Sequence, residues 1–292
     1  MTPRPRPVEA LFLVLATLFA VTPAAAAEGD RLLATGGASS IEGGGGGGIV
    51  PWAVVAGYGT ESQWGGAAFL TRAQTRDFAL EVQGLALGLG NRLELALAEQ
   101  RLELPTLAGA LALPVDRFRQ RVISAKLRLA GDLVYTGMPQ VSLIAQHKRH
   151  RDFLVPSLVG ARDDEGIDWV LSASKLWLAG AAGYNLLGTL NLRSSRANQA
   201  GLLGFGGDGG DDRRLLFEGS LAVLPDRHWA VGLEYRQKPD RLRFAREDDW
   251  RDAFVAWFPN KRVAVVAAWA DLGDIATLRD QRGWYLSLQV SQ

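Results

Sequence analysis

The sequence predicts an all-β protein, a transmembrane antiparallel up-and-down β-barrel of about 14 strands (12–14). Three observations favour this fold class. Apolar and polar residues alternate over windows of about eight to twelve residues, tryptophans lie near the ends of these windows, and short and long connections alternate along the chain. This combination is typical of a barrel that turns its apolar faces to lipid and its polar faces to a lumen.

The first element in the chain is a segment that we expect to be removed. Arg4 and Arg6 precede an apolar run that ends at Val21, and a run of small residues follows at 24–27. These features predict a cleaved secretory signal peptide at residues 1–27. An N-terminal membrane anchor is the alternative, but the apolar run is shorter than the ~20 residues that a spanning helix needs.

The composition of the mature chain excludes several classes of function. Loss of Arg4, Arg6 and Glu9 with the signal leaves 30 basic and 30 acidic residues, so the formal charge is zero and no nucleic-acid partner is expected. The chain has no cysteine. Disulfides, C-x-x-C redox motifs and thiolate metal sites are therefore excluded.

The strands are predicted from a period of two in the apolar residues. Leu93, Leu95 and Leu97, for example, share one face, while Glu94 lies on the other. The windows with this pattern are residues 91–104, 122–132, 139–148, 183–195, 228–237 and 282–290. Residues 106–114 are the one segment for which a short helix is predicted as the alternative to a strand.

A water-soluble sandwich has the same alternation, so strand length and tryptophan placement decide between the two architectures. The windows have the ~9–11 residues of a membrane-spanning strand rather than the five or six usual in soluble proteins. Tryptophans near strand ends predict aromatic girdles at both lipid interfaces. The girdle is assigned to Trp52, Trp64, Trp169, Trp229, Trp250 and Trp284 near strand starts, with Trp257 and Trp269 near strand ends.

The connections predict topology and domain boundaries. Long polar connections at residues 103–117, 149–166, 195–213, 238–249 and 272–281 alternate with short ones, as external loops alternate with periplasmic turns. About thirteen strands can be read from Val50 onward, and an even count requires one more before it. We therefore expect a Gly-rich segment at 28–48 that supplies a first strand and hairpin, and a barrel at 49–292. A flexible linker is the alternative for the glycines at 43–48.

Several long motifs give the chain a family resemblance. They are "ATGGASSIEGGGGGGIVPWAVVAGYGT", "KLWLAG", "RSSRANQAGLLGFGGD", "EYRQKPDRL", "FPNK" and "QRGWYLSLQ". With these motifs the chain resembles the proteobacterial family called domain of unknown function 3034, over nearly the whole mature sequence. The resemblance implies an exported Gram-negative protein of the outer-membrane barrel type without an assigned activity. It supplies no catalytic residues.

Charged residues on the polar strand faces are the candidates for a functional lumen. An Arg or Lys facing lipid at the membrane midplane costs about 2–4 kcal/mol, so such residues are expected inside the barrel. The lumen candidates are Lys126, Arg128, Lys148, Arg193, Arg236, Glu94 and Glu234, and Glu81 and Glu218 are expected to face the same way. They either pair to fill the interior or line a channel whose mixed charge sets its selectivity.

Other chemistry is only weakly indicated. Asp208, Asp211 and Asp212 lie in a Gly-rich loop and are candidates for a Ca²⁺ site, although their spacing is not that of an EF-hand and a solvated turn is favoured. His147 and His150 are interpreted as part of a basic strand end rather than an acid–base pair. No cofactor is predicted.

The first functional hypothesis is an outer-membrane pore or transporter for a small solute that the sequence does not identify. The alternatives are a structural or interaction barrel that acts through its external loops and, third, an enzyme that modifies lipid or peptide. Because no catalytic motif is found, the protein is not expected to be an enzyme. The expected partners are outer-membrane lipid, lipopolysaccharide and the barrel assembly machinery.

Overall fold

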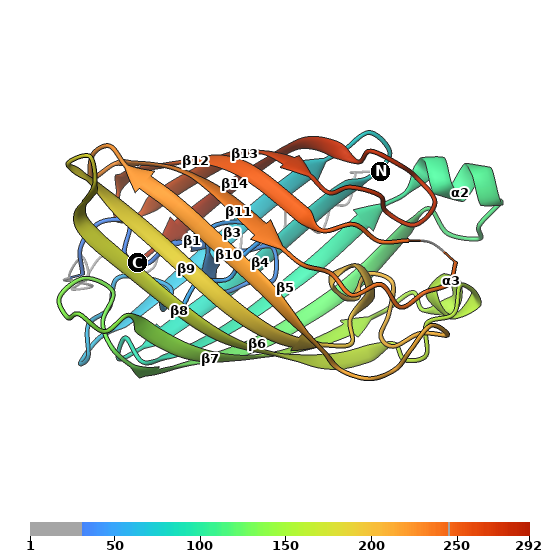
Figure 1. The fold of residues 1–292 in the computed structure, drawn as a ribbon, viewed down its shortest axis with the longest axis horizontal. Helices are drawn as coiled ribbons and strands as arrows, with labels where there is room; N and C mark the ends of the chain where they lie inside the picture. The colour runs from blue at the N-terminus through green and yellow to red at the C-terminus, as the bar shows by residue number, and fades with distance from the viewer. Residues whose placement is uncertain (1–30, 245) are drawn as a thin grey trace, which may run out of the picture.

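Twelve antiparallel strands, β3 to β14, close into a single barrel in which β14 pairs with β3 (Figure 1). The structure, a computed structural model, describes residues 31–244 and 246–292. The signal peptide expected at residues 1–27 therefore lies outside the described residues. No helix in the described part of the chain is long and apolar enough to cross a membrane. The all-β class and the up-and-down barrel are confirmed.

In the described part of the chain the elements follow one another as β-hairpins, with three short helical segments in the connections. Their bounds are β1 Ala38–Ser39, β2 Gly45–Gly46, β3 Trp64–Gln74, β4 Ala79–Leu89, β5 Leu93–Glu103, α2 Pro105–Leu111, β6 Arg117–Ala130, β7 Gln140–His150, α3 Leu154–Leu158, β8 Glu165–Ala181, β9 Tyr184–Ser195, η1 Asn198–Gly201, β10 Arg214–Leu224, β11 Trp229–Arg236, β12 Trp250–Asn260, β13 Val263–Asp271 and β14 Arg282–Ser291. The helix allowed near residues 106–114 is α2.

Every second residue of each strand points outward, and these residues are mainly apolar in the middle of the strands and toward the short turns. Leu95 and Leu190 lie on this surface, whereas their neighbours Glu94 and Asn191 are buried inside. Exposed tryptophans lie near both ends of the strands. They are Trp64, Trp177, Trp229 and Trp257 toward the short turns, and Trp169, Trp269 and Trp284 toward the long loops.

The two ends of the barrel differ in their connections. One end carries short turns and the C-terminus, and the other carries the long loops that contain α2, α3 and η1 (Figure 1). The long loops share a small apolar core of their own, in which Leu107, Val155, Leu203 and Ile275 meet Phe118 of the wall. The loops therefore fold over this mouth of the barrel.

Residues 35–59, called the plug below, lie inside the barrel, and every one of them is buried. Within the plug, β1 and β2 pair as a small antiparallel hairpin, with Ala38 opposite Gly46. A barrel of about eight strands is just wide enough to be filled by its own side chains. Twelve strands leave a wider interior, and here a segment of main chain occupies it.

The plug explains why the wall has 12 strands rather than the 14 favoured by the sequence. Two segments expected in the wall, one within residues 28–48 and one starting at Val50, both lie in the lumen. The wall begins at Trp64 instead of residue 49. Because two predicted strands are absent from the wall, the number of wall strands is still even.

Candidate functional site

The candidate functional site is the contact between the plug and the polar side of the lumen. Strands β5 to β11 alternate charged or amide residues inward with apolar residues outward, so their polar faces meet inside the barrel. Four of the predicted lumen cations are fully buried there: Lys126, Lys148, Arg193 and Arg236. Each of them contacts either a carboxylate or a main-chain carbonyl of the plug.

Glu42, in the loop of the β1–β2 hairpin, is the central residue of the largest ionic cluster in this contact. Its carboxylate accepts hydrogen bonds from Lys148 Nζ, from Arg193 Nη2 at 2.9 Å and from Arg236 Nη2 at 2.7 Å. These three cations come from β7, β9 and β11. Glu42 is only 1% exposed, so a single plug residue joins three strands of the wall out of contact with water.

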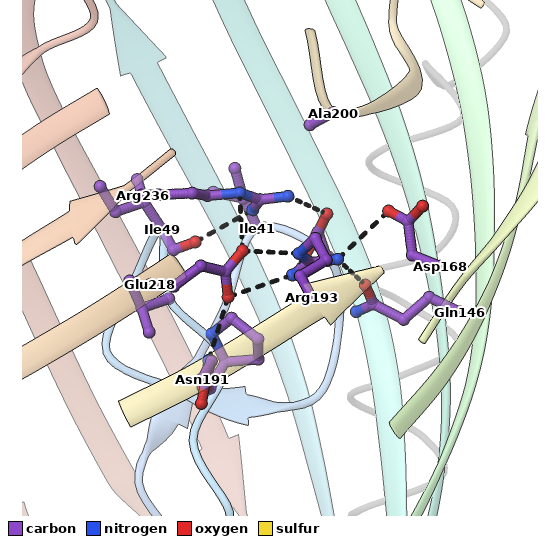
Figure 2. Close-up of polar contacts among 12 residues, drawn as sticks. Ile41, Ile49, Gln146, Asp168, Asn191, Arg193, Ala200, Glu218 and Arg236 are labelled. Atoms are coloured by element: carbon purple, nitrogen blue, oxygen red, sulfur yellow. Dashed lines mark hydrogen bonds and ion pairs between the residues drawn. The ribbon is translucent and has the colours of Figure 1, made fainter. Parts of the chain in front are cut away.

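Two carboxylates of the wall complete this cluster (Figure 2). Asp168 lies 2.7 Å from Lys148 Nζ and 3.2 Å from Arg193 Nη1. Glu218 lies 2.5 Å from Arg193 Nε and 3.2 Å from Arg236 Nε. The cluster thus contains three carboxylates and three cations, so its formal charge is zero. Neutrality matters because an uncompensated charge would be costly at this depth.

A second ion pair, formed by two residues of the wall, binds the plug at β2 and at residues 54–56. Glu94 and Lys126 face each other across β5 and β6, with 3.1 Å between Oε1 and Nζ. Glu94 also accepts hydrogen bonds from the amides of Ala56 and Gly45, at 2.7 and 3.3 Å. Lys126 donates to the carbonyls of Val54 and Gly45, at 2.7 and 3.1 Å. The pair therefore binds two separate segments of the plug main chain, one at Gly45 and one at residues 54–56.

Glu234 of β11 binds a third part of the plug. It accepts hydrogen bonds from the amides of Ile49 and Val50, at 2.8 and 3.2 Å, and from Trp52 Nε1 at 3.3 Å. Neutral side chains bind the remaining plug main chain from other strands. These contacts are Gln100 to Ile41 O, Gln140 and Ser142 to Ala53 O, Ser174 to Ala53 N, Asn191 to Pro51 O, and Tyr285 to Gly47 O.

The glycine run lies in the most crowded part of this contact. A Cβ added at Gly44 or Gly47 would lie 2.2 or 2.1 Å from a carboxylate oxygen of Glu94 or Glu234. At Gly46 it would lie 2.6 Å from the carbonyl oxygen of Val50. At these positions the plug main chain therefore approaches the wall and the neighbouring main chain too closely for a side chain. The run is not a flexible linker.

The sector of the lumen formed by β3, β4, β12 and β13 is mainly apolar, although Thr71 and Asp252 also point inward. Phe69 of β3, Val82 of β4, Phe254 of β12 and Val266 of β13 point inward and belong to one buried cluster with plug residues. The plug residues in this cluster are Ala38, Ile41, Ile49, Val50, Trp52 and Val54. The plug is thus bound by the charged groups of β5 to β11 on one side, and on the other side it packs mainly against apolar residues, with hydrogen bonds to Tyr285 and Gln289 of β14.

Several predicted residues lie elsewhere. Arg128 lies on the same face as Lys126 but near the β6–β7 turn, where it contacts Asp132 and the carbonyl of Gly131. Glu81 points outward and pairs with Arg72. The expectation that Glu81 faces the lumen is therefore wrong, whereas Arg128 lies on the inward face of β6 but apart from the ionic clusters.

Two of the predicted girdle tryptophans lie inside the barrel. Trp52 belongs to the plug, and Trp250 of β12 lies beneath Arg236 and Lys238 at the long-loop end. Their assignment to the girdle is corrected for this reason. Trp64, Trp169, Trp229 and Trp284 are exposed on the outer wall.

The loop candidates for a metal site contact arginines or main-chain amides. Asp211 pairs with Arg196 and Arg162, Asp212 lies 3.3 Å from Arg241, and Asp208 accepts a hydrogen bond from the amide of Arg243. Among the described residues, no group of three or more histidines, aspartates and glutamates is arranged to hold a metal ion.

Glu42 was missed from the sequence, as was Asp168. One signal could have identified Glu42. It is the only charged residue between Arg31 and Glu61, immediately before a run of six glycines. A single charge in an otherwise apolar and glycine-rich segment has to find a partner when the segment is buried.

Comparison with known proteins gives a family but no activity. A family model described as "Protein of unknown function (DUF3034)" matches residues 35–289. Among curated protein sequences, none matches this chain. Solved structures with a similar fold include the KdgM porin, at 8% identity and a TM-score of 0.47 over 77% of this chain and 98% of that one. The NanC porin is similar at 9% identity and 0.46 over 78% and 99%, and Omp33 of Acinetobacter baumannii at 10% and 0.42 over 79% and 99%.

Proposed function

The chain belongs to the DUF3034 family of proteins of unknown function, and for this member we propose an outer-membrane channel for small solutes whose N-terminal plug closes the lumen. Under this proposal the protein is exported by its signal peptide and inserted by the barrel assembly machinery, with outer-membrane lipid and lipopolysaccharide around it. The short turns face the periplasm and the long loops face outward.

The observation that carries the proposal is the ionic attachment of the plug through Glu42. A segment that only filled the barrel could be held by apolar residues at equal or lower free energy, because buried ion pairs rarely add net stability. Water can replace the contacts of Glu42, Glu94 and Glu234 when the plug moves. Once it moves, the same side chains would line an aqueous path across the polar sector, which is the lining that a selective channel needs.

One pair of positions allows the plug to be fixed in place. A Cβ added at Gly43 would lie 3.7 Å from the Cβ of Ala96 on β5, close to the mean spacing in disulfides, which is about 3.8 Å. The natural chain has no cysteine, so the double variant Gly43→Cys, Ala96→Cys forms no competing disulfide. Because Gly43 has a φ of +111°, the extent of cross-linking has to be measured on a gel.

The test is single-channel recording from the double variant in planar bilayers. We expect brief openings in the reduced protein and their loss in the oxidised protein, with recovery after reduction of the same channels. A variant without residues 35–59 should conduct continuously. If this deletion variant is folded, as judged by slower migration after boiling, and still does not conduct, the channel proposal is wrong.

A role as an interaction barrel is the second candidate, and one observation favours it. Leu111 at the end of α2, and Leu154 and Leu158 of α3, are exposed at the outer tips of the long loops. Large apolar side chains at such positions are typical of contacts with another molecule. A folded deletion variant that does not conduct would leave this candidate as the favoured one.

A further inference from the structure

Glu234 of β11 and Asp252 of β12 are two buried carboxyl groups that face each other in the lumen. They occupy directly opposite positions on the neighbouring strands, and they are only 3% and 6% exposed. Side chains at such positions have Cβ atoms ~4.5–5.5 Å apart. Two negative charges this close together and this deeply buried repel each other, so the two groups are not expected to be ionised at the same time.

The two carboxyl groups differ in their hydrogen bonds. Glu234 accepts from the plug amides of Ile49 and Val50 and from Trp52 Nε1, and these three donors stabilise a negative charge. In the described part of the chain, neither oxygen of Asp252 has a hydrogen-bond partner. The main-chain N–H of Glu234 lies nearby but does not reach hydrogen-bond geometry. A buried carboxyl group without partners avoids the cost of an unpaired charge by staying neutral.

The charged and titratable groups around this pair are bonded to other residues. They are Glu218 of β10, Arg236 of β11, Lys238 just beyond it, Tyr285 of β14 and Glu42 of the plug. Arg236 contacts Glu42 and Glu218 at 2.7 and 3.2 Å. Lys238 contacts Glu247 at 3.3 Å, and Tyr285 donates to the main chain of Gly47. On the other side of Asp252, β13 places Ala270. None of these cations is therefore left to neutralise Asp252.

A proton is the ligand that fits this position. Among the described residues, no group of three or more histidines, aspartates and glutamates is placed to hold a metal ion. A proton needs only one oxygen of Asp252, and it leaves the three hydrogen bonds of Glu234 intact.

We propose that Asp252 carries a proton while the plug is closed and that loss of this proton releases the plug. In the closed state, a charge on Asp252 would lie beside the ionised Glu234, out of contact with water. Once the plug moves, water reaches both carboxylates and the repulsion is screened. Ionisation of Asp252 therefore favours the open state, so the plug is held most firmly at low pH and is released as the pH rises. This inference rests on the opening of the plug proposed above, but not on conduction.

Infrared difference spectroscopy of the barrel in lipid nanodiscs detects the proton directly. A protonated carboxylic acid has a C=O stretching band that a carboxylate lacks. At pH 6, where a hydrated aspartate is ionised, the natural protein should show such a band, and Asp252→Asn should lose it. Asp271→Asn is the matched control, because it removes a carboxylate from the outer side of the neighbouring strand β13, where Asp271 pairs with Arg282. This variant should keep the band.

Hydrogen exchange tests whether the proton holds the plug. The amides of Ile49 and Val50 are bonded to Glu234, so they exchange when this part of the plug opens. After correction for intrinsic exchange, they should exchange at least about tenfold faster at pH 9 than at pH 6. Asp252→Asn cannot ionise and should remain slow at pH 9. Asp252→Ser is a second neutral variant with a smaller side chain, and it should abolish the pH dependence as well.

A further control separates this proton from the titration of the adjoining loop. Glu247→Gln removes a titratable group from the β11–β12 loop and should leave the pH dependence of the Ile49 and Val50 amides in place.

Two results would overturn the proposal. One is a carboxylic acid band of equal intensity in the natural protein and in both Asp252 variants, because the proton would then lie elsewhere. The other is plug exchange that does not change with pH, or that changes equally in Asp252→Asn and Asp252→Ser. Conduction by the variant without residues 35–59 is independent of Asp252, so either result can be told apart from failure of the channel proposal.

Discussion

At the scale of single residues, Glu42 decides how firmly the plug is held. Without its carboxylate, Lys148, Arg193 and Arg236 share only Asp168 and Glu218, and the buried cluster has a net positive charge. Breaking a buried ion pair by removing one partner costs about 3–5 kcal/mol. We expect Glu42→Ala to lower the free energy of plug opening by about 3 kcal/mol, the lower end of that range, because the cations keep two carboxylates.

Hydrogen exchange measures this effect directly. The amides of Ile49, Ala53 and Ala56 are bonded to wall side chains, so each exchanges only when the plug opens. In Glu42→Ala their exchange should be about a hundredfold faster, and Glu42→Gln should lie between this variant and the natural protein. Glu61→Ala removes an exposed carboxylate just outside the plug and should leave these rates unchanged. Equal rates in Glu42→Ala and Glu61→Ala would show that the cluster does not hold the plug.

The outer face makes a second prediction at this scale. Leu190 lies in the middle of β9 and is 60% exposed on the lipid side, whereas Leu215 lies near the long-loop end of β10. A charge costs about 2–4 kcal/mol at the membrane midplane and about 0–1 near the interface. Leu190→Arg should therefore impair assembly, seen as a smaller heat-modifiable fraction on gels, and Leu215→Arg should not. Similar behaviour of the two variants would contradict the assigned depth.

At the scale of elements, the plug depends on its glycines for close approach to main chain. A methyl group at Gly46 meets the Val50 carbonyl oxygen, the Ser40 Cβ and the Pro51 Cα at 2.6, 3.0 and 3.1 Å, so the main chain itself would have to move. We expect Gly46→Ala to displace the β1–β2 hairpin and to speed exchange of the plug amides. Gly109→Ala is the matched control, because that Cβ in α2 meets nothing within 4 Å and alanine favours a helix. Unchanged exchange in Gly46→Ala would show that the fit is looser than described.

The β11–β12 loop is predicted to respond to pH through Glu247. Burial raises the pKa of Glu247 from 4.5 to about 7, although Lys238 opposes the rise and Asp240 adds to it. The closed loop thus binds the proton more tightly than the open loop does. Its stability is lowest above pH 7, increases as the pH falls from about 7 to about 4.5, and is constant below that. Loop amides, corrected for intrinsic exchange, should be better protected at pH 5 than at pH 8. Glu247→Gln should remove the difference, and a difference that persists in this variant would exclude Glu247 as its source.

At the scale of the whole molecule, the sequence predicts the barrel well and the plug poorly. Each wall strand has a period of two that depends only on its own residues, so Leu95 and Glu94 could be assigned to opposite faces at once. The plug has no such period. Its shape depends on contacts with residues far away in the chain, such as Glu42 with Arg236 and Gly47 with Tyr285. Trp52 was misassigned for the same reason, since its position follows from the plug and not from a strand.

The predicted site residues show the same division. Lys126, Lys148, Arg193 and Arg236 were placed in the lumen by alternation, and the structure buries them there. Their pairing could not be predicted, because strand neighbours alone do not say which carboxylate reaches across the barrel. Arg128 is on the predicted face, but it lies at the end of β6, so it pairs with Asp132 of the turn and not with the lumen clusters.

The charge of the wall as a whole sets the selectivity expected of the channel once the plug is absent. Beside Lys126, Lys148, Arg193 and Arg236, the lumen has the buried carboxylates of Glu94, Asp168, Glu218, Glu234 and Asp252, so a preference for anions should be absent or small. The effect of each charge on selectivity depends on its position along the lumen. Lys126 lies deep in the lumen beside Glu94, whereas Arg128 is already paired with Asp132 at the short-turn end. In a barrel lacking residues 35–59, Lys126→Glu should therefore shift the reversal potential in a salt gradient clearly toward cations, and Arg128→Glu should shift it much less.

Equal shifts in the two variants would mean that the short-turn mouth contributes as much to selectivity as the middle of the lumen. No shift in either variant would place the constriction under the long loops.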